Sequence, residues 1–453
     1  MDNDTICAVA TPAGGALAII RVSGNRAIEI VSEEFSKNLL LAKGNTLHYG
    51  TIGRKEAIDD VLVSVFRTPH SYTGEDSVEI SCHGSQYIVQ QILHLLVKKG
   101  CRMANPGEYT QRAYLNGKLD LSQAEAVADL IASTNRATHQ IAMSQLRGSF
   151  SSELSLLREN LLKLTSLLEL ELDFSDHEDL EFADRSELTE IAKEIDKKIN
   201  HLANSFEIGQ ALKQGIPVAI VGKTNVGKST LLNRLLHEER AIVSDIHGTT
   251  RDTIEDTIDL QGVSFRFIDT AGIRQTADAI EKIGIERTYA SIQKARIVIW
   301  VIDEQPTPEE LQDMLESTKD KSLIITQNKI DKEEKENLSF NLSAQTNKYS
   351  IISISAKHNI NIDKLEEAIF KAADIPTISE SDVIVTNTRH YEALTRSSQA
   401  LSRVLDGLKM GLSGDLLSED LRDVLSILSE ITGGEITTNE VLGNIFKHFC
   451  VGK

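Results

Sequence analysis

The sequence predicts a multidomain protein that combines α/β and all-helical parts, with a doubly wound, mostly parallel sheet at its centre. Three observations support this prediction. A glycine-rich loop follows an apolar run at residues 217–221 and opens a helix at about Lys228. Strand-like and helix-like segments then alternate as far as residue 375. The flanking stretches, 119–214 and 376–453, show mainly helical periodicity.

The N-terminal part, residues 1–118, predicts a mixed α/β domain. Its expected elements are strands at residues 16–22, 61–66 and 78–82 and a helix at 86–99. Pro69 and Gly84 are boundary residues for the strands, and Gly100 is the expected stop of the helix.

The first helical stretch has leucines at spacings of three and four, which predicts one apolar helix face. These leucines are Leu154, Leu157, Leu161, Leu164 and Leu168. A bundle core is the favoured interpretation; a dimer seam is weaker, because the stripe covers only about two heptads. The second stretch has expected breaks near Gly414 and at Gly433 and Gly434. We expect the two stretches to pack as one bundle, with residues 215–375 inserted between them.

The central region predicts a sheet whose strands are covered on both faces. Continuous apolar strands are expected at residues 217–221, 296–303, 323–326 and 349–355. Runs of this kind, without polar alternation, are typical of parallel sheets. Gln261 and Gly262 predict a hairpin turn between strands at 257–260 and 263–268, and Pro376 is expected to end the region.

Composition limits the class of protein. The chain has 453 residues, enough for about three domains. Its formal net charge of −19 argues against a generally basic nucleic-acid or membrane surface. Its four cysteines show no Cys-x-x-Cys spacing, which predicts a reducing compartment. The N-terminus is acidic and no apolar run reaches about 18 residues, so we expect a cytoplasmic protein without a membrane span.

Five short motifs follow one another in a fixed order in the central region. The first is GKTNVGKS at residues 222–229; GTTRD at 248–252, DTAG at 269–272, NKID at 328–331 and SAK at 355–357 come after it. Each motif is weak evidence alone. In this order and at this spacing they predict a domain that binds GTP with Mg²⁺ and transfers the terminal phosphoryl group to water.

The chemistry of these motifs assigns expected roles. Glycines at 222 and 227 let backbone N–H groups converge on phosphate oxygens at a helix N-terminus. Lys228 is expected to place its charge at the β- and γ-phosphates, and Ser229 and Thr250 to bind Mg²⁺. Asp269 is expected to hold a Mg²⁺-bound water, and the Gly272 N–H group to reach the γ-phosphate.

Base selection is assigned to the fourth and fifth motifs. The Asp331 carboxylate can accept from N1–H and N2–H of guanine, whereas adenine offers no such pair, so GTP is expected to bind much better than ATP. Lys329 is expected to support the ring and the Ala356 N–H group to meet O6. The residues expected to line the nucleotide are Asn225, Val226, Gly227, Lys228, Ser229, Thr230, Ser244, Asp245, Ile246, His247, Gly248, Thr249, Thr250, Asp269, Thr270, Ala271, Gly272, Asn328, Lys329, Asp331, Ser355, Ala356 and Lys357.

One catalytic group is missing from its usual place. Many small GTPases have a water-orienting glutamine directly after the Asp-x-x-Gly motif, where this chain has Ile273. Asn225 can supply an oxygen to a monovalent cation that replaces the charge of an arginine finger. Glu281 is a candidate for positioning water, although a solvated helix face is the simpler interpretation of that residue.

Further motifs lie outside the central region. They are DTI at residues 4–6, ATP at 10–12, IRVSG at 20–24, YTGED at 72–76, NGKLDL at 116–121 and FCVGK at 449–453. With them, the chain closely resembles the bacterial tRNA-modification GTPase family MnmE, also called TrmE, over nearly its whole length. A valine at 451, where isoleucine or leucine is often seen, is a minor departure.

The resemblance implies a domain plan and a function. Residues 1–118 would form a tetrahydrofolate-binding domain that dimerises, 119–214 and 376–453 one helical domain, and 215–375 the GTPase domain. The homodimer would work with the FAD-dependent protein MnmG (GidA) in a heterotetramer or larger complex. Together they would install an aminomethyl or carboxymethylaminomethyl group at C5 of the wobble uridine, U34, of certain tRNAs. A 5-formyl- or 5,10-methylene-tetrahydrofolate would supply the one-carbon unit.

The resemblance also implies roles for single residues. The GTPase domains would meet across the dimer with K⁺ bound by Asn225, Ser244, Ile246 and Thr249, and Glu281 would position water. Folate would be bound by Arg21, Glu79, Lys118 and Lys453, where surface charge is the alternative interpretation; basic groups suit a glutamate tail and a carboxylate suits a pterin N–H edge. Cys450 would be a candidate catalytic thiol. The other residues with an expected catalytic role are Glu281, Asn225 and Lys228.

A second function remains open from the residues alone. The same nucleotide motifs occur in GTPase switches that act in ribosome assembly or RNA binding without folate chemistry. Folate binding that needs residues 1–118 would separate the two hypotheses.

Overall fold

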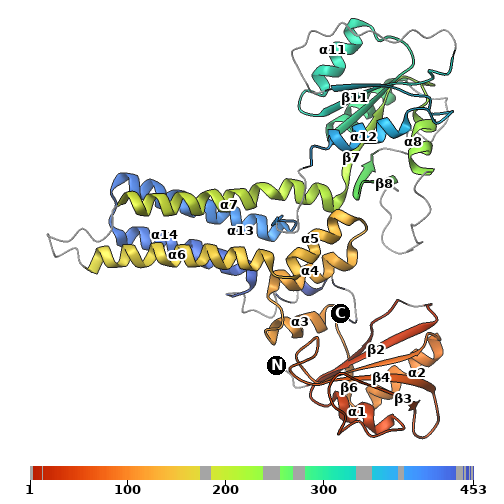
Figure 1. Ribbon diagram of the computed structural model, residues 1–453, viewed down its shortest axis with the longest axis vertical. Helices are drawn as coiled ribbons and strands as arrows, with labels where there is room; N and C mark the ends of the chain where they lie inside the picture. The colour runs from red at the N-terminus through yellow and green to blue at the C-terminus, as the bar shows by residue number, and fades with distance from the viewer. Residues whose placement is uncertain are drawn as a thin grey trace. The chain divides into compact units, whose positions relative to one another are not determined.

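The computed structural model divides into two compact units (Figure 1). Unit 1 comprises Met1–Ala132, Ala142–Ala203 and Arg389–Lys453, and unit 2 comprises Ser133–Ile141 and Asn204–Thr388. The described residues are 4–12, 14–173, 185–237, 256–268, 281–332, 349–375, 382–434, 442, 445–447, 449 and 452. Side chains are described for all of these except 170–173, 237 and 281–287.

Unit 1 begins with a six-stranded sheet in the order β3-β4-β5-β2-β1-β6. Its strands are β1 (Thr5–Val9), β2 (Leu17–Ser23), β3 (Thr46–Ile52), β4 (Asp59–Phe66), β5 (Ser77–His83) and β6 (Cys101–Met103). Neighbours are antiparallel except for β1 and β6. Helices α1 (Ala27–Glu34) and α2 (Gln86–Lys98) share an apolar core with one face of the sheet.

Along these strands buried residues alternate with more polar or exposed ones, and the latter point to the other face of the sheet. Arg21 of β2 lies beside Glu79 of β5 in the strand register. Tyr109 of α3 (Glu108–Leu115) covers this face at β1, where it packs with Ile6 and Ala8. Toward β3 the same face is open: the exposed fractions are 61% for Leu47, 60% for Tyr49 and 41% for Leu62. These three apolar residues, together with Leu17, are called the open sheet face below.

The rest of unit 1 is helical. The helices are α4 (Leu121–Ala132), α5 (Arg136–Leu146), α6 (Ser149–Asp173), α7 (Arg185–Gln214), α13 (Thr388–Met410) and α14 (Gly414–Thr432), of which α5 and α7 continue into unit 2. The five leucines of the predicted stripe in α6 are all buried. Helix α14 packs against α6, and Ser398 of α13 donates to Asp196 of α7. Helices from both sides of the central region therefore pack together.

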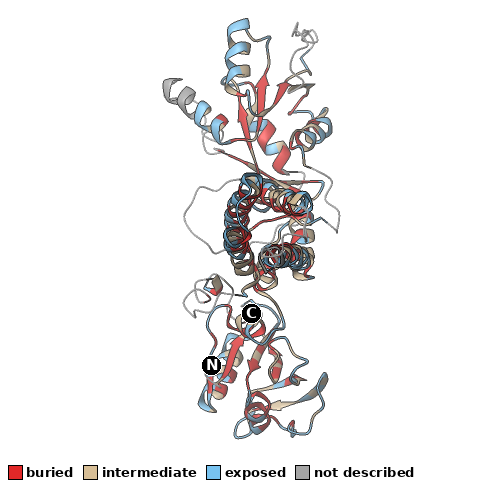
Figure 2. Ribbon diagram, turned by 90° about the vertical axis from the view of Figure 1, so that its left-hand side faces the viewer, coloured by how far each residue is buried: buried red, intermediate tan, exposed pale blue. Residues whose placement is uncertain are grey.

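Unit 2 contains a second six-stranded sheet in the order β12-β11-β10-β7-β9-β8. Its strands are β7 (Ile216–Val221), β8 (Asp256–Leu260), β9 (Val263–Phe267), β10 (Ile297–Ile302), β11 (Ser322–Gln327) and β12 (Tyr349–Ser353). All pairs are parallel except β8 with β9. The buried strands are red in Figure 2, and many outer helix positions are pale blue.

Helices cover both faces of this second sheet. One core includes side chains of α8 (Lys228–His237) and α12 (Ile362–Ala372). The core on the other face includes side chains of α10 (Glu281–Lys294), and α11 (Pro308–Ser317) packs against it. The doubly wound, mostly parallel arrangement predicted from the apolar runs is confirmed.

The hairpin predicted at Gln261 and Gly262 joins β8 to β9. Both residues have positive φ angles, 55° and 85°. A Cβ atom at Gly262 would overlap the Arg136 side chain, while the Gly262 carbonyl accepts from Ala137 N at 3.0 Å. Glycine is therefore required by both the turn and the approach of α5.

Some elements differ from the prediction. Strands β1, β3 and β6 were not predicted, and the helix break expected near Gly414 lies at residues 411–413, directly before α14. Pro376 lies outside the described residues. Among the described helices, none combines the length and apolar character that crossing a membrane requires.

Candidate functional site

The loop between β7 and α8 depends on two glycines. Gly222 and Gly227 have φ angles of 145° and 101°, a region that favours glycine. A Cβ atom at Gly222 would overlap the carbonyl oxygen of Val301, and one at Gly227 would overlap Nδ2 of Asn328. The loop therefore lies directly against β10 and against the residues after β11, and it leads into the N-terminus of α8, where backbone N–H groups favour an anion.

Lys228 is the first residue of α8, and its side chain bends back over this loop. Its Nζ donates to the carbonyl oxygens of Gly222 at 2.7 Å and Lys223 at 2.6 Å. Burial lowers the pKa of Lys228. The ammonium group is thus held against the start of the loop by two backbone carbonyls.

The NKID segment is tied to this loop by two side chains. Asn328 is buried; its Nδ2 donates to Val226 O at 2.8 Å, and its Oδ1 accepts from Ala356 N at 3.0 Å. Lys329 Nζ donates to Asn225 O at 2.6 Å. The phosphate loop, the NKID segment and the SAK segment therefore form one hydrogen-bonded assembly at the carboxyl ends of β7, β11 and β12.

Asp331 is held in place by its neighbours in this assembly. Its Oδ1 accepts from Ser355 Oγ at 2.7 Å, and its Oδ2 lies 3.6 Å from Nε2 of His358. The hydrogen bond from Ser355, with further help from nearby positive charge, lowers the pKa of Asp331. The carboxylate is therefore ionised at neutral pH, as acceptance from two N–H groups requires.

The remaining expected nucleotide residues fall into a described group and a group outside the described part of the chain. Ser229 and Thr230 lie in the first turn of α8, and Lys357 follows Ala356. Glu281 begins α10, but its side chain is not described. The residues that lie outside the described part of the chain are Ser244, Asp245, Ile246, His247, Gly248, Thr249, Thr250, Asp269, Thr270, Ala271 and Gly272.

Two residues of this assembly were missed by the sequence analysis. Arg234 of α8 donates to the carbonyl oxygens of Ala356 at 3.4 Å and Lys357 at 3.2 Å. Asp303 forms an ion pair with Lys329. Neither residue belongs to a motif. The position of Asp303 at the end of an apolar strand could have indicated a ligand site, because parallel sheets bind ligands at the carboxyl ends of their strands.

A second candidate site lies in the N-terminal sheet. Arg21 Nη2 is 2.8 Å from Glu79 Oε1, and Nη1 donates to Gly452 O at 3.3 Å. The guanidinium carbon lies 5.4 Å from the Tyr72 ring centroid and 5.6 Å from that of Tyr109. Arg21, Glu79 and Tyr72 line a cavity of about 80 Å³. The structure thus brings two of the expected folate residues together.

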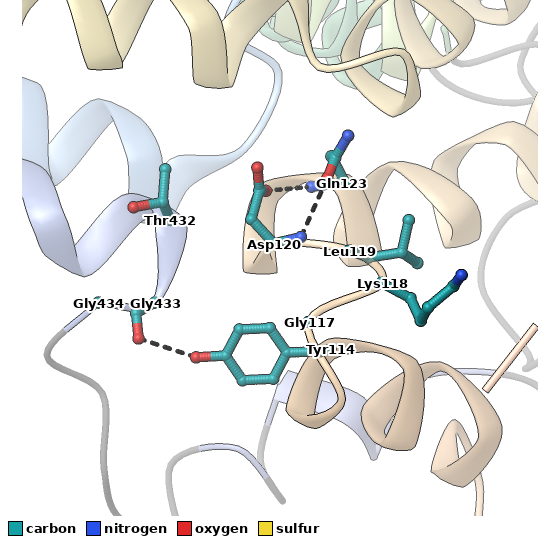
Figure 3. Close-up of a pocket in the computed structure, with 9 residues that line it drawn as sticks. All are labelled: Tyr114, Gly117, Lys118, Leu119, Asp120, Gln123, Thr432, Gly433 and Gly434. Atoms are coloured by element: carbon teal, nitrogen blue, oxygen red, sulfur yellow. Dashed lines mark hydrogen bonds between the residues drawn. The ribbon is translucent and has the colours of Figure 1, made fainter. Parts of the chain in front are cut away.

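Lys118 lies in a different place from this pair. Its Nζ donates to Pro69 O at 3.0 Å, and it lines a separate, wider cavity of about 500 Å³ with Tyr114 and Asp120. In Figure 3 the Lys118 ammonium points away from Tyr114, whose hydroxyl donates to Gly433 O at 2.8 Å. Lys453 and Cys450 lie outside the described residues.

The motifs DTI and YTGED supply a buried ion network close to β2. Arg112 of α3 is 9% exposed; its Nη2 lies 2.6 Å from Asp4 Oδ1, and its Nη1 lies 3.2 Å from Glu75 Oε1. Glu108 accepts from Arg112 and from Arg102. Burial alone would raise the pKa of Glu108, but these two arginines and the Asn105 N–H group outweigh it and lower the pKa.

The fold and the nucleotide assembly define a P-loop GTPase domain, combined with an N-terminal α/β domain and a helical domain. A family model described as the MnmE helical domain matches residues 121–450, and one described as the GTP-binding protein TrmE N-terminus matches residues 5–118. These two matches together span nearly the whole chain.

Two bacterial relatives match this chain over its full length. The tRNA modification GTPases MnmE of Bacteroides thetaiotaomicron and Phocaeicola vulgatus are 55% and 54% identical to this chain; each match covers 100% of this chain and 100% and 99% of the relative. A GTP-binding protein of Sulfolobus solfataricus in complex with GDP is 21% identical over 48% of this chain and 67% of its own, with a TM-score of 0.25. The assignment rests on the sequence relatives: this chain belongs to the tRNA modification GTPase MnmE family.

Proposed function

We propose that this chain hydrolyses GTP with Mg²⁺ and takes part in the modification of wobble uridine, U34, in certain tRNAs. Family membership supports the reaction class. The observation that carries the nucleotide part is the hydrogen-bonded assembly in which Asn328 and Lys329 join the base-recognition segment to the phosphate loop. A cytoplasmic location is part of this proposal.

In the proposed site, Lys228 binds the β- and γ-phosphates, and Ser229 and Thr250 bind Mg²⁺. Asp331 selects guanine, with its carboxylate fixed by Ser355. A magnesium ion would supply charge neutralisation at the phosphates, and the Ser229 hydroxyl in the first turn of α8 suits it, because Mg²⁺ prefers oxygen ligands.

For the monovalent cation we propose Asn225, Ser244, Ile246 and Thr249 as ligands of K⁺, with Glu281 positioning water. Asn225 is exposed and has a φ angle of 63°, which the Lys329 hydrogen bond to its carbonyl helps to hold. Its side chain therefore stands at the rim of the phosphate loop, where an added positive charge can act on the γ-phosphate.

We propose that a tetrahydrofolate derivative, 5-formyl- or 5,10-methylene-tetrahydrofolate, binds at Arg21 and Glu79, with Lys118 and Lys453 completing the site. The described cavity of about 80 Å³ is smaller than the roughly 300–1,000 Å³ of usual ligand sites. The site would need further groups, which the C-terminal residues Cys450 and Lys453 and a second copy of the chain can supply.

A homodimer through the open sheet face is part of this proposal. Leu47, Tyr49 and Leu62 form an exposed apolar surface on the sheet face that also carries Arg21 and Glu79. Covering it with the same surface of a second copy would remove apolar area from water and enclose the folate pair. The FAD-dependent MnmG protein is proposed as the partner of this dimer for transfer to tRNA.

We also propose that residues 215–375 form a GTPase domain inserted into one helical domain, 119–214 and 376–453, behind a folate domain at 1–118. A fragment of residues 216–373 that folds, and whose excision leaves a folded helical remainder, would support this plan. Loss of both pieces would contradict it.

The main test combines two measurements. Cells without this chain should lose the modified wobble nucleosides, and the purified chain should hydrolyse GTP faster in K⁺ than in Na⁺. An Asn225→Ala variant should lose the K⁺ stimulation while it still binds GDP. Unchanged wobble nucleosides would favour a GTPase switch without folate chemistry.

A further inference from the structure

Asp303 is the first residue after β10 and lies beside the nucleotide assembly. Its Oδ2 is 2.8 Å from Nζ of Lys329, which also donates to Asn225 O at 2.6 Å. Both side chains of the pair are 27% exposed, so water screens them only in part. The Lys329 ammonium therefore has an anionic partner on one side and a phosphate-loop carbonyl on another.

The backbone fixes where the Asp303 carboxylate lies. Every residue of β10 is buried, and Ile302 is in register with Gln327 of β11. The Ile302 carbonyl also accepts from Asn328 N at 2.8 Å. Asp303 and Lys329 thus follow two adjacent, parallel and largely buried strands, β10 and β11, at neighbouring positions.

A lysine side chain has four rotatable bonds, and its ammonium group can satisfy a single carbonyl acceptor in several rotamers. Two acceptors at fixed positions restrict the lysine side chain to far fewer rotamers. Restricting the Lys329 chain before the nucleotide binds lowers the entropy cost of placing it against a base. The hydrogen bond from Lys329 also holds the Asn225 carbonyl, and with it the positive φ angle of Asn225 in the phosphate loop.

We propose that Asp303 is a positioning residue for guanine nucleotides, acting through Lys329 on both the base segment and the phosphate loop. This inference rests on the proposed nucleotide site. An ordinary surface ion pair of the same length would be expected to contribute little. Asp303 differs because its partner is itself a nucleotide-site residue with a second fixed acceptor.

The first test measures the Kd of GDP and the steady-state hydrolysis of GTP by the full chain. Asp303→Asn keeps the shape of the side chain and removes its charge. We expect the Kd of GDP and the KM for GTP to rise about tenfold, with kcat changed less than about twofold. Glu304→Gln is the matched control: it removes a charge from the next residue, which is exposed, and should leave both constants unchanged. A Kd of GDP within about twofold of the unaltered protein would overturn the proposal.

A second test asks whether Asp303 acts through Lys329. In a double-mutant cycle, adding Asp303→Asn to Lys329→Met should cause no further rise in the Kd of GDP. Asp303→Glu, which keeps the charge, should recover part of the affinity. Additive losses in the cycle, or an equal drop in nucleotide-free thermal stability for Asp303→Asn and Asp303→Glu, would show a general structural role and overturn the inference. Failure of the unaltered chain to bind GDP would instead count against the proposed nucleotide site.

Discussion

The phosphate loop of unit 2 and the ion network of unit 1 hold positive charge in two different ways. Lys228 is held by backbone carbonyls five and six residues before it. Arg112 is held by carboxylates that include Asp4, 108 residues away in the sequence. In the first case the local backbone path makes the site, and in the second a fold assembled from distant segments makes it. Substitutions in the two regions should therefore damage different properties.

The largest effect is expected in unit 1. Arg112→Met should leave Asp4, Glu75 and Glu108 without their common partner, and breaking a buried ion pair in this way costs about 3–5 kcal/mol. Unfolding in denaturant should be followed by far-UV circular dichroism and by the fluorescence of Trp300, the single tryptophan, which lies in β10 of unit 2. The circular dichroism signal should show unfolding at a lower denaturant concentration than in the unaltered protein, whereas the Trp300 fluorescence transition should not shift.

The control for this variant is Arg26→Met. Arg26 pairs with Glu29 at 2.9 Å, but both side chains are about half exposed and screened by water, so the loss of stability should be much smaller than for Arg112→Met. A shift of the Trp300 transition by Arg112→Met, or equal effects of the two variants, would contradict the contrast between the regions.

The second prediction concerns the backbone of the phosphate loop. Gly227→Ala should raise the Kd of GDP about 100-fold, because the added Cβ would displace the Asn328 amide and the φ of 101° disfavours alanine. Gly411→Ala is matched for backbone strain, with a φ of 72° and the nearest atom 3.6 Å from an added Cβ, and should leave the Kd unchanged. Normal GDP binding by Gly227→Ala would show that the loop does not depend on this close approach.

The same contrast explains what could be predicted from the sequence. Strand β10 is six buried residues in a row, and the phosphate loop is a short motif, so both are local signals. Strand β3 has only one buried residue, at its end, and its pattern resembles a loop. Arg21 and Glu79 are 58 residues apart; the family resemblance implied only that both bind folate, and their ion pair was not predicted, because periodicity within one element says nothing about its neighbours.

The roles of Tyr109 and Arg112 were missed for the same physical reason. Tyr109 is buried against β1 and donates to Arg21 O at 2.7 Å, 88 residues away. The position of Asp303 after an apolar strand was a signal for the ligand-binding edge of the sheet, but carboxylates are common there, and its pairing with Lys329 is visible only in the fold. In each case the tertiary contact, and not the local sequence, gives the residue its role.

A third, smaller effect is expected for Glu125 of α4. Its Oε2 lies 2.7 Å from Nε2 of the buried His390 and 3.0 Å from Arg389. Burial alone would raise the pKa of Glu125, but His390 and Arg389 outweigh burial and lower it. The ionised carboxylate therefore stabilises the fold above its unfolded-state pKa, and this contribution is lost as the pH falls through the lowered folded-state value.

Glu125→Gln should accordingly lower the unfolding free energy of unit 1 by about 2 kcal/mol at pH 7. The difference from the unaltered protein should narrow only below about pH 4. Denaturant unfolding followed by circular dichroism, from pH 7 down to values below about pH 4, measures this difference. Asp406→Asn, which alters an exposed pair with Lys409 on α13, is the control and should show almost no change. A penalty that grew toward low pH would contradict the assignment.

The smallest effect is expected for Glu310, and it sharpens the contrast within unit 2 itself. Glu310 completes the capping box of α11 and pairs with Lys223 of the phosphate loop at 2.6 Å, a shorter distance than that between Asp303 and Lys329. Lys223 is 72% exposed, however, so solvent screens the pair and its side chain loses more freedom on pairing. Glu310→Gln keeps the cap geometry and should change the Kd of GDP less than about twofold, against about tenfold for Asp303→Asn. Because the shorter ion pair is predicted to matter less, equal effects of the two variants would mean that proximity to the loop, and not a fixed second acceptor, determines the contribution.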